Sequence, residues 1–245
     1  MPPSITIVIQ LLEMLLSLEE GVKSFSVSFS QQGSMIQDIV TGKVTRQLAD
    51  YYAAQIGCED ASIHLVYHQW MGAFPMNRDS ADQLINMSTV IASMVGADKI
   101  ITKTREEAVG IPTKEANAQT VANTQYTLNI LGGLPAITDE QEEEILTAEV
   151  HAIMEAVFND PADTLWRKVF NSIKNGIIDV PFSPHIINHN KMITIRDAQK
   201  NIRIIERGSV PIPDRCYEYE RSCCDLNKDT TSIVNDIIHD IGIMQ

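Results

Sequence analysis

The chain has 245 residues, of which 44% are hydrophobic and 21% are charged, an ordinary composition for a globular protein. Its 19 basic and 32 acidic side chains give a formal net charge of −13, which argues against binding nucleic-acid backbones or anionic membrane surfaces. The sequence contains no uninterrupted apolar run of ~18 residues that could span a membrane, and its first basic residue is Lys23, so no secretory signal is expected.

Four cysteines do not make a disulfide framework at this length, and their spacing does not suit a zinc site. We therefore expect free thiols in a reducing compartment, which favours a cytoplasmic location. The cysteines are Cys58, Cys216, Cys223 and Cys224.

The first half of the chain alternates between helical and strand patterns. Residues 5–16 carry an apolar stripe at helical spacing, with Ser4 able to cap its start and Gly21 able to end it. Three strand-like segments follow, at 22–29, 61–67 and 98–104, each with a loop and then a helix, the helices running to about residue 56 and over 80–95 and 115–131. Their spacing of about 38 residues is typical of repeated βα units.

Beyond Pro135 the pattern changes. Helices are expected over the acidic segment that starts near residue 139 and over the segment between Pro161 and Gly176. After these we expect a short buried strand at 177–182, a β-ribbon with its turn at Asp197–Asn201, and a last helix at about 229–242.

Three βα units and one further strand make about half of a (β/α)8 barrel, and an initial helix precedes the first of these strands. The predicted fold class is therefore α/β, an incomplete TIM barrel that holds the C-terminal half of the strands. Residues 1–135 would form its βα units, and residues 136–245 the remaining barrel elements and a C-terminal helical and β-ribbon extension. An open doubly wound sheet is the alternative, although neither a GxGxxG nor a GxxxxGK[ST] loop supports a nucleotide site. An incomplete barrel exposes a sheet edge, so the chain should dimerise, aggregate or pair with a separately encoded first half.

In both architectures functional groups gather just after the carboxyl ends of the strands. His68, Gln69 and Trp70 place an imidazole, an amide and a large ring at one strand end. The alternative interpretation is structural: Trp70 caps the rim and His68 satisfies a backbone carbonyl.

The loop after the third strand is rich in charged and amide side chains, and its alternative interpretation is a solvated loop with a helix start at Glu115. Its candidate residues are Lys103, Glu107, Lys114, Glu115 and Asn117. Glu19 is also unexpected, because a carboxylate at a helix C-terminus is disfavoured by the helix dipole and needs another partner.

Four segments in chain order carry a resemblance to a known family. They are GVKSFSVSFSQQGSMIQDI (21–39), HQWMGAFP (68–75), ADKIITKTREEAVGIPTKEAN (97–117), and IIDVPFSP (177–184) followed by KMITIRD (191–197). Together they resemble the large (epsilon) subunit of glutamate mutase, also called methylaspartate mutase. The resemblance covers nearly the whole chain but only the second half or so of that larger subunit, in agreement with the strand deficit.

The resemblance implies an isomerase that uses adenosylcobalamin to interconvert L-glutamate and threo-3-methylaspartate. In that family the cobalt–carbon bond breaks homolytically, and the adenosyl radical removes a hydrogen from the substrate, whose fragments then recombine. The large subunit is a TIM barrel that buries the substrate and the adenosyl group, because radical chemistry needs water excluded. A separate cobalamin-binding small subunit carries the corrinoid.

Residue by residue, the resemblance places the catalytic, substrate-ammonium-binding carboxylate on Glu19. Two substrate-binding tyrosines of the family fall on Phe25 and Phe29, which cannot donate the corresponding hydrogen bonds. Positions near the cofactor fall on Ser28, Lys174 and Ile178. The arginines that hold the substrate carboxylates belong to the half of the subunit that the resemblance does not cover.

Two hypotheses follow. The chain is either a mutase component that is active only with the missing half, or a truncated or degenerate relative that binds a partner without catalysis or acts on another amino acid. The phenylalanines at 25 and 29 favour the second hypothesis, whereas Glu19 and the loops at 68–70 and 110–117 favour the first. The segment DIIHDIG (236–242) does not match the Asp-x-His-x-x-Gly cobalamin-ligand motif, so the small subunit is the expected corrinoid carrier.

Overall fold

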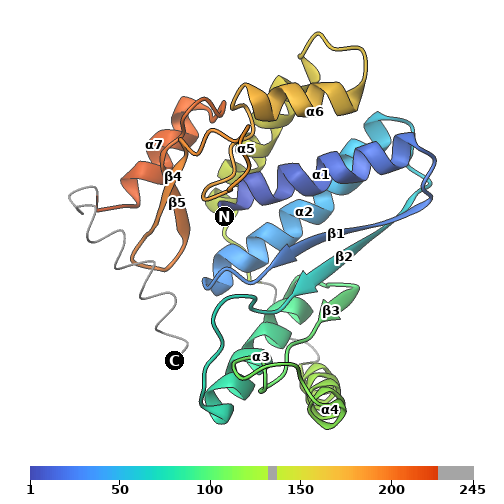
Figure 1. Cartoon of the computed structure of the whole chain (residues 1–245), viewed down its shortest axis with the longest axis vertical. Coiled ribbons are helices and arrows are strands. Elements are labelled where there is room, and N and C mark those ends of the chain that lie inside the picture. Colours follow the sequence, from blue (N-terminus) through green and yellow to red (C-terminus); the bar gives the residue numbers. More distant parts are fainter. Residues whose placement is uncertain (132–136, 226–245) are drawn as a thin grey trace.

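A computed structural model describes residues 1–131 and 137–225 (Figure 1). The expected helix at 229–242, the DIIHDIG segment and the boundary at 135/136 therefore lie outside the described residues. In chain order the elements are α1 (Pro3–Glu19), β1 (Ser24–Ser30), α2 (Met35–Gln55), β2 (Ser62–His68), α3 (Arg78–Met94), β3 (Lys99–Ile101), α4 (Lys114–Ile130), α5 (Glu140–Phe158), α6 (Leu165–Lys174), β4 (Ile193–Arg196), β5 (Ile202–Glu206) and α7 (Asp214–Ser222). None of these helices combines the length and hydropathy needed to cross a membrane.

The mixed α/β fold is built on a parallel three-stranded sheet in the order β1-β2-β3. Ser24 pairs with Ser62 and Ser30 with His68, while β3 pairs only with the carboxyl end of β2. Helix α2 connects β1 to β2 and α3 connects β2 to β3, so the predicted βα repeats are confirmed (Figure 1).

Alternation along the strands decides which side of the sheet faces the core. Val27 and Phe29 of β1 are buried with Tyr67 of β2, whereas Ser28 between them is only partly buried and Ser26 is exposed. The Phe29 and Tyr67 rings lie with their centroids 5.0 Å apart. On α2, a Cβ at Gly42 would lie 2.6 Å from Phe29 Cζ, so only glycine lets α2 approach the sheet this closely.

Helix α1 begins two residues earlier than its sequence predicts. Pro2 occupies the N-cap position and Pro3 the first helical position, so Ser4 lies inside the helix and is fully buried. The prediction of Ser4 as the cap was therefore wrong, because proline lacks the N–H that a cap would satisfy and its fixed φ suits the first turn. Gly21, with φ of +89°, follows the helix end as predicted.

The segment 177–182 does not form the predicted strand. Instead, the buried Asp179 carboxylate gathers the chain around itself. Its Oδ1 accepts a hydrogen bond from the Asn190 N–H at 2.7 Å, and its Oδ2 accepts from the Lys191 and Met192 N–H groups at 2.7 and 2.9 Å. A carboxylate that bonds several backbone donors favours a curled loop over an extended ladder.

The predicted β-ribbon is confirmed. Strands β4 and β5 pair antiparallel, and Asp197 Oδ1 accepts from the N–H groups of Gln199 and Asn201, both at 2.9 Å, to close the turn between them. The ribbon and α7 lie beside the N-terminus of α1 and the start of α5 (Figure 1).

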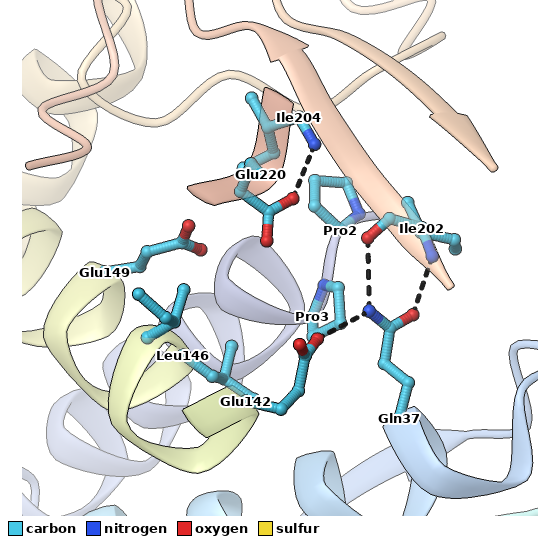
Figure 2. A pocket seen from close by; sticks show the side chains of 10 residues that line it. Pro2, Pro3, Gln37, Glu142, Leu146, Glu149, Ile202, Ile204 and Glu220 are labelled. Carbon is cyan, nitrogen blue, oxygen red and sulfur yellow. Dashed lines mark hydrogen bonds between the residues drawn. The ribbon is translucent and has the colours of Figure 1, made fainter. Parts of the chain in front are cut away.

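Buried charges attach this ribbon to the helices. Arg203 of β5 contacts Asp197 at 2.8 Å, Glu142 of α5 at 2.8 Å and Glu220 of α7 at 3.2 Å. Gln37 of α2 bonds both the Ile202 backbone, at 2.8 and 3.1 Å, and Glu142 (Figure 2). One buried network therefore joins four elements that are distant in sequence.

Candidate functional site

The carboxyl ends of the three parallel strands meet at one edge of the sheet, which we call the carboxyl edge. The ladder continues past the strands themselves: the Gln31 N–H donates to the His68 carbonyl at 3.0 Å, and the Gln69 N–H donates to the Ile101 carbonyl at 3.2 Å. The loops that follow therefore start from fixed positions, as in parallel α/β folds whose sites lie at this edge.

Gln69 links the carboxyl edge to its supports. Its side chain is fully buried, and its Nε2 donates to the Ile85 carbonyl at 3.1 Å and to Thr89 Oγ1 at 3.2 Å. Its Oε1 accepts the Lys103 N–H at 2.8 Å. The amide thus fixes the backbone of the loop after β3 relative to helix α3, which is a positioning function.

Trp70 closes the end of the sheet. Its backbone N–H donates to Gln31 Oε1 at 3.2 Å, and its indole Nε1 donates to the Ala73 carbonyl at 2.9 Å. The ring packs with Phe74 and the first turns of α3 in a small hydrophobic cluster. A Cβ at Gly72 would lie 2.7 Å from the ring, so the tight loop requires glycine there.

His68 is the last residue of β2 and is partly exposed. Burial lowers the pKa of its imidazole below the usual 6.5, and the positive charge of Lys103 lowers this pKa further. The ring is therefore neutral at neutral pH, so it can both donate and accept hydrogen bonds.

Beyond β3, Lys103 and Glu107 form an ion pair with 3.3 Å between Nζ and Oε2, and about a quarter of each side chain is exposed. Glu107 Oε1 also accepts the Thr104 N–H at 3.4 Å. This pair presents one cation and one anion to solvent directly after a strand end. Both residues were among the candidates predicted from the sequence of this loop, and their Lys-x-x-x-Glu spacing allows the contact.

The other residues predicted in this loop form a helix start. Helix α4 begins at Lys114, and the preceding Thr113 caps it by accepting the Ala116 N–H at 3.1 Å. The Lys114 and Glu115 side chains are strongly exposed and lie 3.7 Å apart, and Asn117 donates to the Thr113 carbonyl at 2.9 Å. Their helix-start interpretation is therefore confirmed.

The residues assigned through the resemblance do not gather at the carboxyl edge. Glu19 is the exposed last residue of α1, ahead of β1 at the amino ends of the strands. Phe25 packs at the margin of the main hydrophobic cluster, and Phe29 is buried against α2. Ser28 donates from its backbone and its hydroxyl to Gln10 Oε1 at 2.7 and 3.0 Å.

Lys174 is the last residue of α6, which packs on α5 and α1, and Ile178 lies in the loop that follows this helix. Ile178 is a buried member of the main cluster, and Lys174 is exposed. The assignments of these residues to substrate or cofactor stay predictions, because they rest on the resemblance alone.

Large apolar side chains stand exposed on the loops of the carboxyl edge. Their exposed fractions are 59% for Met71, 62% for Met76, 67% for Val109 and 97% for Ile111. These four side chains, which we call the rim residues, come from two loops that leave the carboxyl edge, 69–77 and 102–113. Large apolar side chains exposed to this extent are typical of surfaces that another molecule covers.

Comparisons with known proteins agree on one family. The model of the family described as methylaspartate mutase E chain (MutE) matches residues 1–230. The chain is 36% identical to the glutamate mutase epsilon subunit of Escherichia coli O157:H7 over 98% of its own length and 52% of that protein. It is 37% identical to the subunit of the same name from Yersinia enterocolitica, over 86% and 45%, and 30% identical to that from Haloarcula marismortui, over 89% and 44%. The chain thus spans about half the length of the curated relatives that it matches.

Proposed function

The chain belongs to the methylaspartate mutase E chain family, and from this premise we propose that it is one component of an adenosylcobalamin-dependent glutamate mutase. The proposed reaction is the interconversion of L-glutamate and threo-3-methylaspartate, an isomerisation. The observation that carries the proposal is the family match over residues 1–230. We place the protein in the cytoplasm as part of the same proposal.

The finer fold in this proposal is the incomplete TIM barrel, divided at residues 135/136. Its support is that the described parallel sheet ends at β1 on one side and at β3 on the other. Helix α4, next to β3, exposes Val121 (59%), Tyr126 (68%) and Ile130 (64%). A cavity of about 470 Å³ is also lined by residues of α4, of the end of α3 and of β3. The proposed cover is a separately supplied polypeptide equivalent to the first half of the relatives.

The chemistry of the carboxyl edge fits an adenosyl group. A ribose needs donors and acceptors for its hydroxyls, and an adenine needs apolar surface and a few polar partners. Lys103, Glu107 and the neutral His68 supply donors and acceptors for the ribose. Val109 and Ile111 supply apolar surface for the adenine. In this proposal these residues hold the adenosyl group.

When bound, adenosylcobalamin supplies the radical that removes hydrogen from the substrate. The residues of this chain contribute by binding and orienting the adenosyl group. Gln69 and Gln31 keep the strand ends in register, Trp70 closes one side, and the Lys103–Glu107 pair orients hydroxyl groups. The substrate-binding arginines must come from the other half, as the resemblance implies.

The proposed partner at this edge is the cobalamin-binding small subunit, which carries the corrinoid. Its docking would cover the rim residues, which are otherwise apolar groups in water. It would also exclude water from the carboxyl edge, as radical chemistry requires.

The test is reconstitution. The chain is mixed with the first half of the Escherichia coli epsilon subunit and with small subunit loaded with adenosylcobalamin, and the conversion of glutamate to 3-methylaspartate is measured. Conversion above each pairwise mixture supports the proposal. Co-elution of all three polypeptides without conversion favours a partner-binding relative without catalysis, and failure to co-elute refutes both.

Variants locate the site within that assay. Lys103→Met and Glu107→Gln each remove one charged contact to the adenosyl group, so we expect conversion to fall about tenfold or more. Lys23→Met and Glu59→Gln are the matched controls, because both residues are exposed away from the carboxyl edge. Equal effects of all four variants would contradict the proposed site.

A further inference from the structure

A buried acid lies directly beneath the carboxyl edge and is used by none of the contacts described so far. Asp38, in the first turns of α2, is fully buried. Its Oδ1 accepts the Gln32 N–H at 2.8 Å, and the nearby Gly33 N–H also favours the charged form of the carboxyl group. Its Oδ2 is buried too, with no hydrogen-bond partner in the described part of the chain.

Gln32 is also held through its carbonyl group. The Gln32 carbonyl accepts from Arg196 Nη2 of the β-ribbon at 2.6 Å, so one residue is fixed through both its N–H and its C=O. Gly33 follows with φ of +110°, and a Cβ there would lie 3.5 Å from the Arg196 guanidinium. Asp38 and Arg196 therefore define the conformation of the loop that leaves β1.

That loop reaches Trp70 through Gln31. Gln31 Oε1 accepts both the Trp70 N–H, at 3.2 Å, and the Ser88 hydroxyl. Tyr67, next to Ser88, is fully buried, and its hydroxyl oxygen has no hydrogen-bond partner among residues 1–131 and 137–225. Burial raises the pKa of the Tyr67 phenol, the charge of Asp38 raises it further, and the neighbouring Ser88 hydroxyl opposes both effects.

Two unpartnered oxygens this deep are costly unless a proton or a water satisfies them. An ionised Asp38 would be only an acceptor, whereas a protonated Asp38 gains a donor on Oδ2 while Oδ1 keeps the Gln32 N–H. The electrostatics agree: burial raises the pKa of Asp38 to about 7, against the opposing effects of the Gln32 and Gly33 N–H groups and of Arg196.

We propose that Asp38 is a proton-binding positioning residue, whose carboxyl group carries a proton on Oδ2 and holds the loop that connects β1 through Gln31 to Trp70. Loss of that proton places a negative charge near the Tyr67 phenol and disturbs the chain of contacts from Ser88 to Gln31 and Trp70. The relevance to turnover rests on the proposed function, but the proton-linked geometry does not, so the test uses the chain alone.

The reporter is Trp70 fluorescence in a Trp166→Phe background, since the sequence has two tryptophans and Trp166 is exposed on α6. We expect the Trp70 emission to shift with a midpoint near pH 7. Asp38→Asn keeps the Oδ1 acceptor and puts an N–H donor where the proton would be. This variant should match the parent at pH 6 and lose the shift between about pH 6 and about pH 8.

Two further variants separate the ionisation of Asp38 from other causes of a change in Trp70 emission. Asp38→Ala removes the acceptor, so it should change the Trp70 emission and lower the melting temperature at every pH. Asp50→Asn, on an exposed position of the same helix, should leave the shift intact. Protonation of His68 falls at lower pH, because burial and Lys103 lower its pKa.

Three results would overturn the proposal. They are a Trp70 emission that stays constant over this pH range in the parent, an unchanged midpoint in Asp38→Asn, and an Asp38→Asn protein that unfolds as readily as Asp38→Ala at pH 6. If the reconstituted enzyme is inactive, these measurements on the chain alone still decide whether Asp38 positions the loop.

Discussion

The Glu149 carboxyl group of α5 faces that of Glu220 of α7 across a cavity of about 10 Å³ (Figure 2). Glu149 Oε1 is buried without a hydrogen-bond partner among the described residues. Burial raises the pKa of Glu149 well above its usual range, and the negative charges of Glu220 and Glu142 raise it further. Burial also raises the pKa of Glu220, to about 7. The Glu149 carboxyl group next to the ribbon therefore keeps its proton at neutral pH.

Replacing Glu149 with glutamine should change how stability depends on pH. The folded protein keeps a proton that the unfolded chain releases near the usual pKa of 4.5. The free energy of unfolding therefore falls as pH rises from that value through the raised folded pKa. Glu149→Gln cannot lose a proton, so its unfolding free energy should fall less between about pH 5 and about pH 8.

Urea unfolding at a series of pH values measures this slope. Glu155→Gln is the matched control, because Glu155 is exposed on the same helix. If Glu149→Gln shows the same slope as the parent, Glu149 is ionised in the folded state and the prediction fails.

Removing Arg203 should destabilise the chain strongly. Its side chain is 4% exposed, and three carboxylates surround it, from Asp197, Glu142 and Glu220. Taking one partner from a buried ion pair costs about 3–5 kcal/mol, because the remaining charge is left uncompensated. We expect Arg203→Met to lower the unfolding free energy by that amount in urea titrations.

Arg167→Met gives the comparison, since Arg167 pairs with Asp163 at the surface. Exposed pairs contribute about 0–1 kcal/mol, so this variant should stay close to the parent. Similar losses for both variants would mean that the Arg203 network is not the anchor of the ribbon.

Periodicity predicted most of the elements correctly, because apolar spacing is a local signal. The βα repeats and the Asp197–Asn201 turn follow from strand alternation and turn chemistry within a few residues. The strand predicted at 177–182 was wrong because a contact with residues distant in the sequence decides the conformation there. The apolar residues of this segment suit a strand, but Asp179 bonds backbone donors at 190–192, and nothing within the segment itself indicates that partner.

The candidate site was predictable in location but not in detail. Strand ends followed by polar residues pointed to His68, Gln69 and Trp70, and all three lie at the carboxyl edge. The sequence does not reveal that the Gln69 amide already bonds α3 and the loop after β3. It also gave no sign that Asp38 lies beneath that edge, because a lone aspartate near a helix start is usually solvated.

Glu19 provides a test of the assignment made through the resemblance. The resemblance assigns the substrate ammonium to Glu19, so in the reconstituted complex we expect Glu19→Ala to lose conversion, although Glu19 is exposed at the amino ends of the strands in this chain. Its unfolding free energy should change by no more than about 0.5 kcal/mol. Conversion at the parent rate in Glu19→Ala would show that Glu19 does not bind the substrate.

Phe29→Tyr distinguishes a packing residue from a substrate-binding one. A hydroxyl on Phe29 Cζ would point at α2, because a Cβ at Gly42 would already lie 2.6 Å from that carbon. Burying a hydroxyl without room or partner costs about 1–3 kcal/mol. We therefore expect Phe29→Tyr to lower the urea midpoint at an unchanged slope.

Phe25→Tyr is the control, because Phe25 is only partly buried and can turn a hydroxyl toward solvent. It should remain close to the parent in stability. If instead both tyrosine variants are stable and the double variant converts glutamate faster in the reconstituted complex, the two rings face the substrate. The arrangement of β1 against α2 would then have to differ in the assembled enzyme.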